Sequence, residues 1–113
     1  MNMEDLSERL QIVIQNAVQL AVSNSNPEIT TSHMLKAVLK DDTCDGLLKE
    51  CDIDKNQMEA IVDRHLKQIA VVSSYNQPAL SYEVNKTLVD AQVYARNLGD
   101  KYLSVSKIGR AHV

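Results

Sequence analysis

The chain has 113 residues, of which 44% are hydrophobic and 24% are charged, and its formal net charge is -3; this size and composition predict one soluble domain with a buried core. The negative charge argues against a nucleic-acid partner, because phosphate binding needs clustered Lys and Arg. No apolar run approaches the roughly 20 residues that span a bilayer, and the first residues lack a basic segment followed by a hydrophobic stretch, so the default expectation is a cytoplasmic protein with no membrane partner.

The residues up to 70 predict four helices, each with an apolar stripe behind a polar start signal. The first runs from Leu6 to Val22, with Ser7 or Asp5 as its N-cap. Three more are expected at 31–40, 45–51 and 55–69. Asp54, with a Gln three residues later, indicates a capping box before the last of these.

The side chains in these helices that could take part in catalysis or bind a metal do not form a pattern typical of either. Cys44 and Cys51 on one helix would have Cα atoms about 10 Å apart, too far for a disulfide, and two cysteines without a nearby His predict no zinc site, so we expect reduced, partly buried thiols. His33 and His65 are expected to be surface or half-buried residues without a catalytic role. The lysines are expected on solvated helical surfaces: Lys36, Lys40, Lys49, Lys55 and Lys67.

A polar, proline-containing linker is expected at 71–80, and after it the chain repeats itself at an offset of 74 residues. The offset carries Leu10 onto Val84 and Ile14 onto Leu88. The second copy predicts a helix that begins after Ser81 and ends at Asn97-Leu98-Gly99. A repeat of this kind indicates a duplicated unit whose copies bury their apolar faces against each other.

The predicted fold is therefore all-α, a duplicated helical repeat of two pseudo-symmetric bundles with an incomplete second repeat. Within a single domain spanning 1–105, repeat one is expected at 7–70 and partial repeat two at 81–105; a second copy as long as the first would extend to about residue 143. Residues 106–113 lack a helical apolar pattern and are expected to be a non-native or disordered tail. The stripe of the second copy would lose part of its partner surface, which predicts self-association.

Two segments carry a resemblance to a known family. The run from Ala91 to Ser104, AQVYARNLGDKYLS, and the run from Thr31 to Leu39, TSHMLKAVL, occur in order behind matching long helices. In this pattern the chain resembles the Clp N-terminal repeat domain of AAA+ chaperones and unfoldases, from residue 3 to about residue 105. The short link and the box Ser32-His-Met-Leu resemble ClpB-type disaggregases more than the unfoldases that serve proteases.

The resemblance implies a binding function at the entrance of a hexameric ring, where the domain engages unfolded or aggregated polypeptide for ATP-driven threading by other domains. The alternative it leaves open is docking of an adaptor or co-chaperone, as in ClpA- or ClpC-type unfoldases. No cofactor is expected in this chain, since its three glycines, Gly46, Gly99 and Gly109, cannot form a phosphate-binding loop. We therefore expect no enzyme activity from the chain itself, with ATP used by the parent protein.

Matching the family motifs residue by residue implies four substrate-binding positions. Ser7 stands where Thr is frequent, Asp100 matches a second polar position, and Leu88 and Tyr94 match apolar positions. A third, acidic position falls on Ser106 and is lost. Ser7 is equally explained as a helix cap and Asp100 as a turn residue, helical spacing makes Leu88 a core residue more often than a site residue, and Tyr94 is the better surface candidate.

Overall fold

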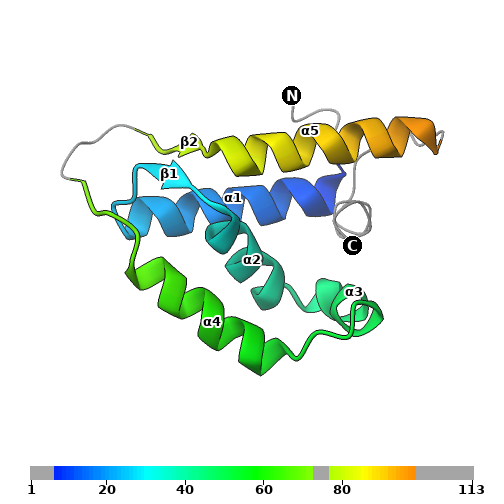
Figure 1. The fold of residues 1–113 in the computed structure, drawn as a ribbon, viewed down its shortest axis with the longest axis horizontal. Coiled ribbons are helices and arrows are strands. Elements are labelled where there is room, and N and C mark those ends of the chain that lie inside the picture. Colours follow the sequence, from blue (N-terminus) through cyan, green and yellow to red (C-terminus); the bar gives the residue numbers. More distant parts are fainter. Residues whose placement is uncertain (1–6, 73–76, 99–113) are drawn as a thin grey trace.

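The computed structural model describes residues 7–72 and 77–98, and within them the chain is built mainly of helices (Figure 1). The elements in chain order are α1 (Glu8–Ser23), β1 (Glu28–Ile29), α2 (Thr31–Lys40), the 3-10 turn η2 (Asp42–Cys44), α3 (Asp45–Glu50), α4 (Lys55–Lys67), β2 (Ala79–Leu80) and α5 (Tyr82–Asn97). The five helices lie where the apolar periodicity predicts them, which confirms the all-α fold class. Asp100 and the expected tail at 106–113 lie outside the described residues.

Helices α1 and α5 reproduce the 74-residue repeat, since each has 16 residues and their ends coincide at this offset. They also begin in the same way. The hydroxyl oxygen of Ser7 accepts a hydrogen bond of 3.2 Å from the Leu10 N–H, and that of Ser81 accepts one of 3.2 Å from the Val84 N–H. Both serines thus satisfy an amide that the first helical turn leaves unpaired.

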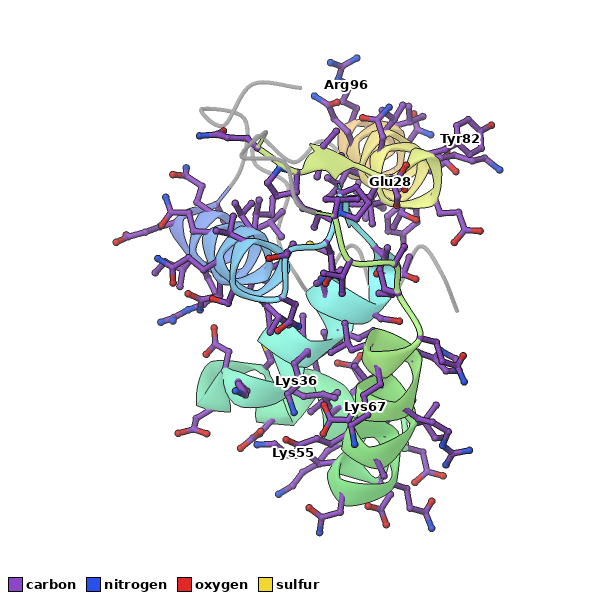
Figure 2. The ribbon with its side chains drawn as sticks, turned by 90° about the vertical axis from the view of Figure 1, so that its left-hand side faces the viewer. Glu28, Lys36, Lys55, Lys67, Tyr82 and Arg96 are labelled. Atoms are coloured by element: carbon purple, nitrogen blue, oxygen red, sulfur yellow. The ribbon has the colours of Figure 1, made fainter. Side chains whose placement is uncertain are left out.

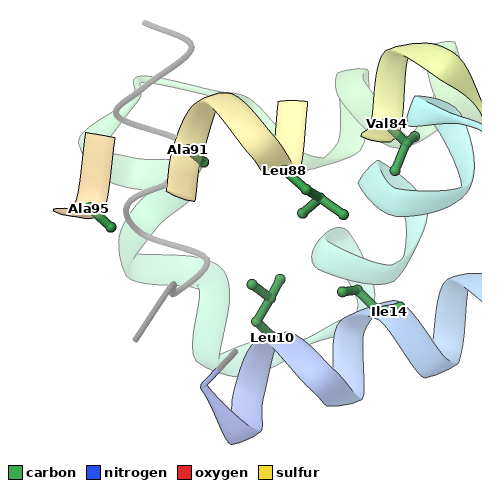
Figure 3. Packing of buried hydrophobic residues seen from close by; sticks show 6 residues of the cluster. All are labelled: Leu10, Ile14, Val84, Leu88, Ala91 and Ala95. Carbon is green, nitrogen blue, oxygen red and sulfur yellow. The ribbon is translucent and has the colours of Figure 1, made fainter. Parts of the chain in front are cut away.

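The two helices run antiparallel and share one layer of core (Figures 1 and 3). This layer, the α1–α5 core, consists of Leu10, Ile14, Val84, Leu88, Ala91 and Ala95. In Figure 3 the larger side chains point from both helices into the space between them. Within the second-copy stripe Val84, Leu88, Ala91 and Ala95 are each at most 4% exposed, whereas Leu98 is 57% exposed.

Helix α2 connects this pair to the rest of the domain. Its Ala37, with Ile29 of β1, packs against the side of α1 formed by Val13, Ala17 and Ala21. On its other side a third cluster joins α2, α3 and α4 through Leu39, Leu48 and Val62. Helix α2 and strand β1 thus cover α1 on the side of Val13, Ala17 and Ala21, and α5 covers it on the side of Leu10 and Ile14.

The two short strands were not predicted, because two-residue segments show no periodicity. They pair in parallel, with Glu28 opposite Ala79 and Ile29 opposite Leu80. The Ser81 N–H donates to the Ile29 carbonyl oxygen at 3.0 Å, at the residue that caps α5. Since β1 follows α1 and β2 precedes α5, the pairing holds the start of α5 beside the end of α1 and so makes the two helices antiparallel.

Candidate functional site

The structure brings two of the predicted site residues, Ser7 and Tyr94, to the same end of the α1–α5 pair. Ser7 caps the start of α1, and Tyr94 lies in the last turns of α5. Because the helices are antiparallel, Leu10 near the start of α1 shares a core cluster with Ala95, the neighbour of Tyr94. We refer to this end of the helix pair, where Ser7 and Tyr94 lie, as the α1–α5 end.

The individual side chains at the α1–α5 end differ in what they offer to a ligand. Ser7 is half-buried, and its hydroxyl oxygen already accepts the Leu10 N–H, so the capping role is present. Tyr94 is half-buried, with an aromatic body and a hydroxyl that suit a mixed apolar and polar contact.

Leu88 has a different position from that expected of a contact residue. It is 4% exposed and belongs to the α1–α5 core together with Leu10. Leu88 can affect binding only indirectly, because it helps to hold the two helices at their spacing. Asp100, the fourth predicted residue, is outside the part of the chain that the structure describes.

His33 departs from the expectation of a surface or half-buried residue, because it is 0% exposed. The ring nitrogen Nδ1 accepts the Thr30 N–H at 2.9 Å, so Nε2 carries the proton and donates to Asn26 Oδ1 at 2.9 Å. The Asn26 amide in turn donates to the carbonyl oxygen of Ala70 at 3.1 Å. Burial lowers the pKa of His33 below its ordinary value, so the ring is neutral. Apolar periodicity did not predict the burial of His33. A polar ring is buried when its nitrogens are hydrogen-bonded, and periodicity does not record such bonds.

Lys36 is also more buried than the lysine pattern predicts, at 9% exposure. Its ammonium group lies 2.8 Å from a carboxylate oxygen of Glu59 and 2.8 Å from one of Asp63, both on α4. Burial acts to lower the pKa of Lys36, but the hydrogen bonds and negative charges of Asp63 and Glu59 outweigh it and raise the pKa. The ion pairs join α2 to α4 and leave Lys36 no role as a base.

A hollow of about 450 Å³ opens beside this ion pair, between the end of α1, α2 and the end of α4. Its lining combines apolar side chains with charges of both signs: Leu20, Asn24, Asn26, Lys36, Asp63, Leu66, Lys67, Ile69 and Val71. Sequence analysis gave no signal for it, because three separate segments contribute. Figure 2 labels two of the lining residues, Lys36 of α2 and Lys67 of α4.

Within residues 7–72 and 77–98, no group of three or more His, Cys, Asp or Glu side chains is arranged to hold a metal ion. Cys44 is buried and Cys51 is half-buried, both as thiols. No helix within these ranges has the length and apolar character needed to cross a membrane.

A family model and several individual relatives match the sequence of this chain. The model of the Clp repeat (R) N-terminal domain family matches residues 5–108. The chain is 34% identical over 106 residues to the chaperone protein ClpB of Mycobacterium leprae and 30% identical over 110 residues to that of Porphyromonas gingivalis. These alignments cover 88% and 96% of this chain but only 12% and 13% of the two relatives, so the chain spans a small part of their length.

Solved structures share the fold. The N-terminal domain of Hsp104 from Candida albicans superposes with a TM-score of 0.83 at 25% identity, covering 95% of this chain and 72% of that one. The N-domain of ClpV in complex with a VipB peptide superposes with a TM-score of 0.80 at 19% identity, covering 96% of this chain and 67% of that one. At the latter identity the likeness concerns the fold alone.

Proposed function

The chain belongs to the Clp repeat N-terminal domain family, and we propose that it is the substrate-binding N-terminal domain of an ATP-dependent, ClpB-type disaggregase that engages unfolded or aggregated polypeptide. The Clp N-domain is a non-catalytic domain of AAA+ chaperones. In this proposal the parent protein is a cytoplasmic hexamer, and ATP is bound and hydrolysed by its other domains. The chain itself needs no cofactor to bind its substrate.

The observation that supports the proposal most directly is the α1–α5 end. Antiparallel packing places the half-buried Tyr94 on the same end as Ser7, two positions that the family motifs associate with substrate handling. An aromatic ring with a polar tip, set on rigid helices, makes apolar contacts with many extended sequences without selecting one. Several such domains on one ring would raise the local concentration of a weakly bound substrate near the pore.

Amide NMR titration with a reduced and alkylated, permanently unfolded polypeptide tests the proposal. We expect weak, saturable shifts in the first turns of α1 and the last turns of α5. Tyr94→Ser should weaken binding, whereas Tyr82→Ser, at the opposite end of the same helix and 79% exposed, should not. A well-dispersed spectrum without shifts at the α1–α5 end would contradict the proposal.

The matched caps separate binding from stability at Ser7. Ser7 and Ser81 make the same capping bond of 3.2 Å at equivalent positions, so Ser7→Ala and Ser81→Ala carry a similar cost in helix stability. If Ser7 contacts substrate, only Ser7→Ala weakens the binding of unfolded polypeptide. Equal effects of the two substitutions on binding would leave Ser7 with a capping role alone.

Adaptor docking is the second candidate function, and one comparison favours it. The ClpV N-domain, whose fold this chain shares, was solved with a peptide of one partner, VipB. On this alternative the chain would bind a single folded partner tightly through a defined patch. Unfolded polypeptide would then produce no saturable shifts, while one adaptor protein would shift a compact set of residues in slow exchange.

A further inference from the structure

The hollow beside the Lys36 ion pairs lies at the opposite end of α1 from Ser7. Its lining residue Leu20 is in the last turns of α1, about 20 Å along the helix from Ser7, which caps its start. The volume of the hollow, about 450 Å³, falls within the range of pockets that hold ligands in proteins. The hollow is therefore a second candidate site, separate from the α1–α5 end.

Aliphatic side chains form a large part of the lining. Leu20, Leu66 and Ile69 are half-buried, and Val71 at the rim is 72% exposed. An apolar side chain of a ligand that enters the hollow removes its own surface and theirs from water, which favours binding by about 25 cal/mol for each Å² of apolar area buried.

The charges of the lining do not select a ligand of either sign. The ammonium group of Lys36 is already paired at 2.8 Å with Asp63, which also lines the hollow, and at 2.8 Å with Glu59. Lys67 forms no ion pair within residues 7–72 and 77–98, but it is exposed, so water screens its attraction for an anion. An uncharged ligand group is therefore the best match to the hollow.

The segment after α4 presents free backbone groups at the rim. The Asn26 side-chain amide donates to the Ala70 carbonyl oxygen at 3.1 Å, and the Val72 N–H donates to the Ser25 carbonyl oxygen at 2.8 Å. Bonds from alternate residues to one turn are typical of an extended chain, in which the residue between them directs its N–H and C=O to the other side. Among the described residues, the Val71 backbone has no hydrogen-bond partner. Unpaired groups of this kind can pair with an extended peptide.

The side chain of Asn24 adds a second contact of the same type. It lines the hollow, is exposed, and makes no hydrogen bond to other residues that the structure describes. A primary amide carries both a donor and an acceptor. A peptide bond presents the same two groups whatever its side chains are, so Asn24 can pair with the backbone of any extended segment.

The 74-residue repeat relates the hollow to the predicted substrate-binding positions. Leu20 corresponds to Tyr94, and Asn26 corresponds to Asp100. Asn26 itself is buried and bonded to His33, so its part in the hollow is to hold the turn after α1 in place. The hollow thus lies in repeat one at the positions that the family motifs associate with substrate in repeat two.

We propose that the hollow binds an extended segment of unfolded polypeptide, with an uncharged apolar side chain inside it and the backbone of the segment paired with Val71 and Asn24. Leu20, Leu66 and Ile69 supply the apolar walls. The backbone contacts depend on the peptide bond and not on the sequence, so the site accepts many segments. This site rests on the proposed function and adds to it a second binding position in repeat one.

The test uses an acetylated and amidated Ser-Leu-Val-Leu-Ser peptide in an amide NMR titration of the chain. We expect saturable shifts of the Val71 amide and of the Asn24 side-chain amide. The same peptide with N-methyl groups on Val and the second Leu cannot donate from these backbone positions and should bind at least about fivefold more weakly. A peptide with Ser in place of both Leu residues should bind at least about tenfold more weakly.

Variants at exposed positions locate the contact without disturbing the fold. Val71→Ser with Asn24→Ala should weaken peptide binding about tenfold or more. The matched control, Val22→Ser with Asn16→Ala, changes exposed residues of α1 outside the hollow and should leave binding unchanged. Lys67→Gln should change the affinity by less than about twofold. A tenfold loss in Lys67→Gln would show that the hollow recognises an anionic group, which would overturn the proposal.

Titration with the permanently unfolded polypeptide separates this site from the α1–α5 end. Shifts at both ends of α1, with Tyr94→Ser weakening only those at the α1–α5 end, support both sites. Shifts confined to the α1–α5 end overturn the hollow as a site and leave the proposed function intact, whereas shifts at the hollow alone support it and reject Ser7 and Tyr94. No shifts at either end reject both. Movement of the Val71 and Asn24 signals on dilution of the free chain would identify a second copy as the occupant and overturn the proposal.

Discussion

Helices α1 and α5 are two copies of one element in two surroundings. They share length, capping serine and the face that joins them, but α1 is also packed against α2. They differ on the side that faces solvent, where α1 carries Glu8, Gln15 and Gln19 and α5 carries Tyr82, Val89 and Val93. The shared interface constrains both copies through packing, whereas the exposed positions are free to diverge and to acquire separate binding roles.

The largest effect is expected from breaking the face that the two copies share. Leu88→Ala should lower the free energy of unfolding by about 2–5 kcal/mol, because Leu88 is 4% exposed within the α1–α5 core. Urea denaturation measures this change. Val89→Ala, the next residue but 44% exposed, should change stability by less than about 0.5 kcal/mol. A loss at Val89 as large as that at Leu88 would contradict the assigned faces.

Asn26 and His33, which follow α1, have different residues at the corresponding positions of the second copy, Asp100 and Lys107. His33→Gln should cost about 1–3 kcal/mol at pH 7.5, because it disturbs buried hydrogen bonds to Thr30 and Asn26.

The pH dependence gives a more specific signature. The folded-state pKa of His33 is below the unfolded value of about 6.5, so the unfolded chain takes up the proton first. The contribution of His33 to stability is therefore complete above pH 7 and is lost as the pH falls through about 6.5 towards the folded-state pKa. Thermal unfolding from pH 7.5 to 5 should show a shallower pH dependence in His33→Gln than in His65→Gln, whose position on α4 is exposed. Equal slopes would exclude this role.

The capping serines should respond alike if the two helix starts are equivalent. Ser7→Ala and Ser81→Ala should each lower stability by about 1 kcal/mol, since each leaves one first-turn amide without its side-chain acceptor. Differential scanning calorimetry of the two variants measures the difference. A loss in only one of them would show that the copies have diverged at their starts.

The smallest expected effect is a gain at the end of α1. Ser25 has a φ of 53°, in the left-handed region, and the repeat places Gly99 at the same position of the second copy. Ser25→Gly should raise stability by about 0.5 kcal/mol, because glycine adopts this conformation without steric cost. Asn24→Gly, at a φ of -92°, should lower it instead. Chemical denaturation of both variants would expose a wrong assignment if Ser25→Gly were destabilising.

Much of the architecture could be predicted because its signals are local. Apolar periodicity located the five helices, and Ser7, Asp54 and Ser81 were recognised as caps that the structure confirms through their hydrogen bonds. The predictions failed at Lys36, whose partners Glu59 and Asp63 lie on another helix, and at His33, whose burial depends on hydrogen bonds to Thr30 and Asn26 that apolar periodicity does not record. Of the predicted site, Ser7 and Tyr94 fall at one end of the α1–α5 pair, Leu88 is in the core, and Asp100 is untested.

The sequence by itself determined the helices, the duplication and the family, since each depends on residue order within one segment or on a fixed offset between two segments. Only the tertiary structure decided which faces are covered. The parallel pairing of Glu28–Ile29 with Ala79–Leu80 makes α1 and α5 antiparallel, and this orientation buries Val84 and Leu88 while leaving Val89 and Val93 in solvent. Burial depends on contacts between segments far apart in the chain. Periodicity within one helix does not specify which other segment packs against it.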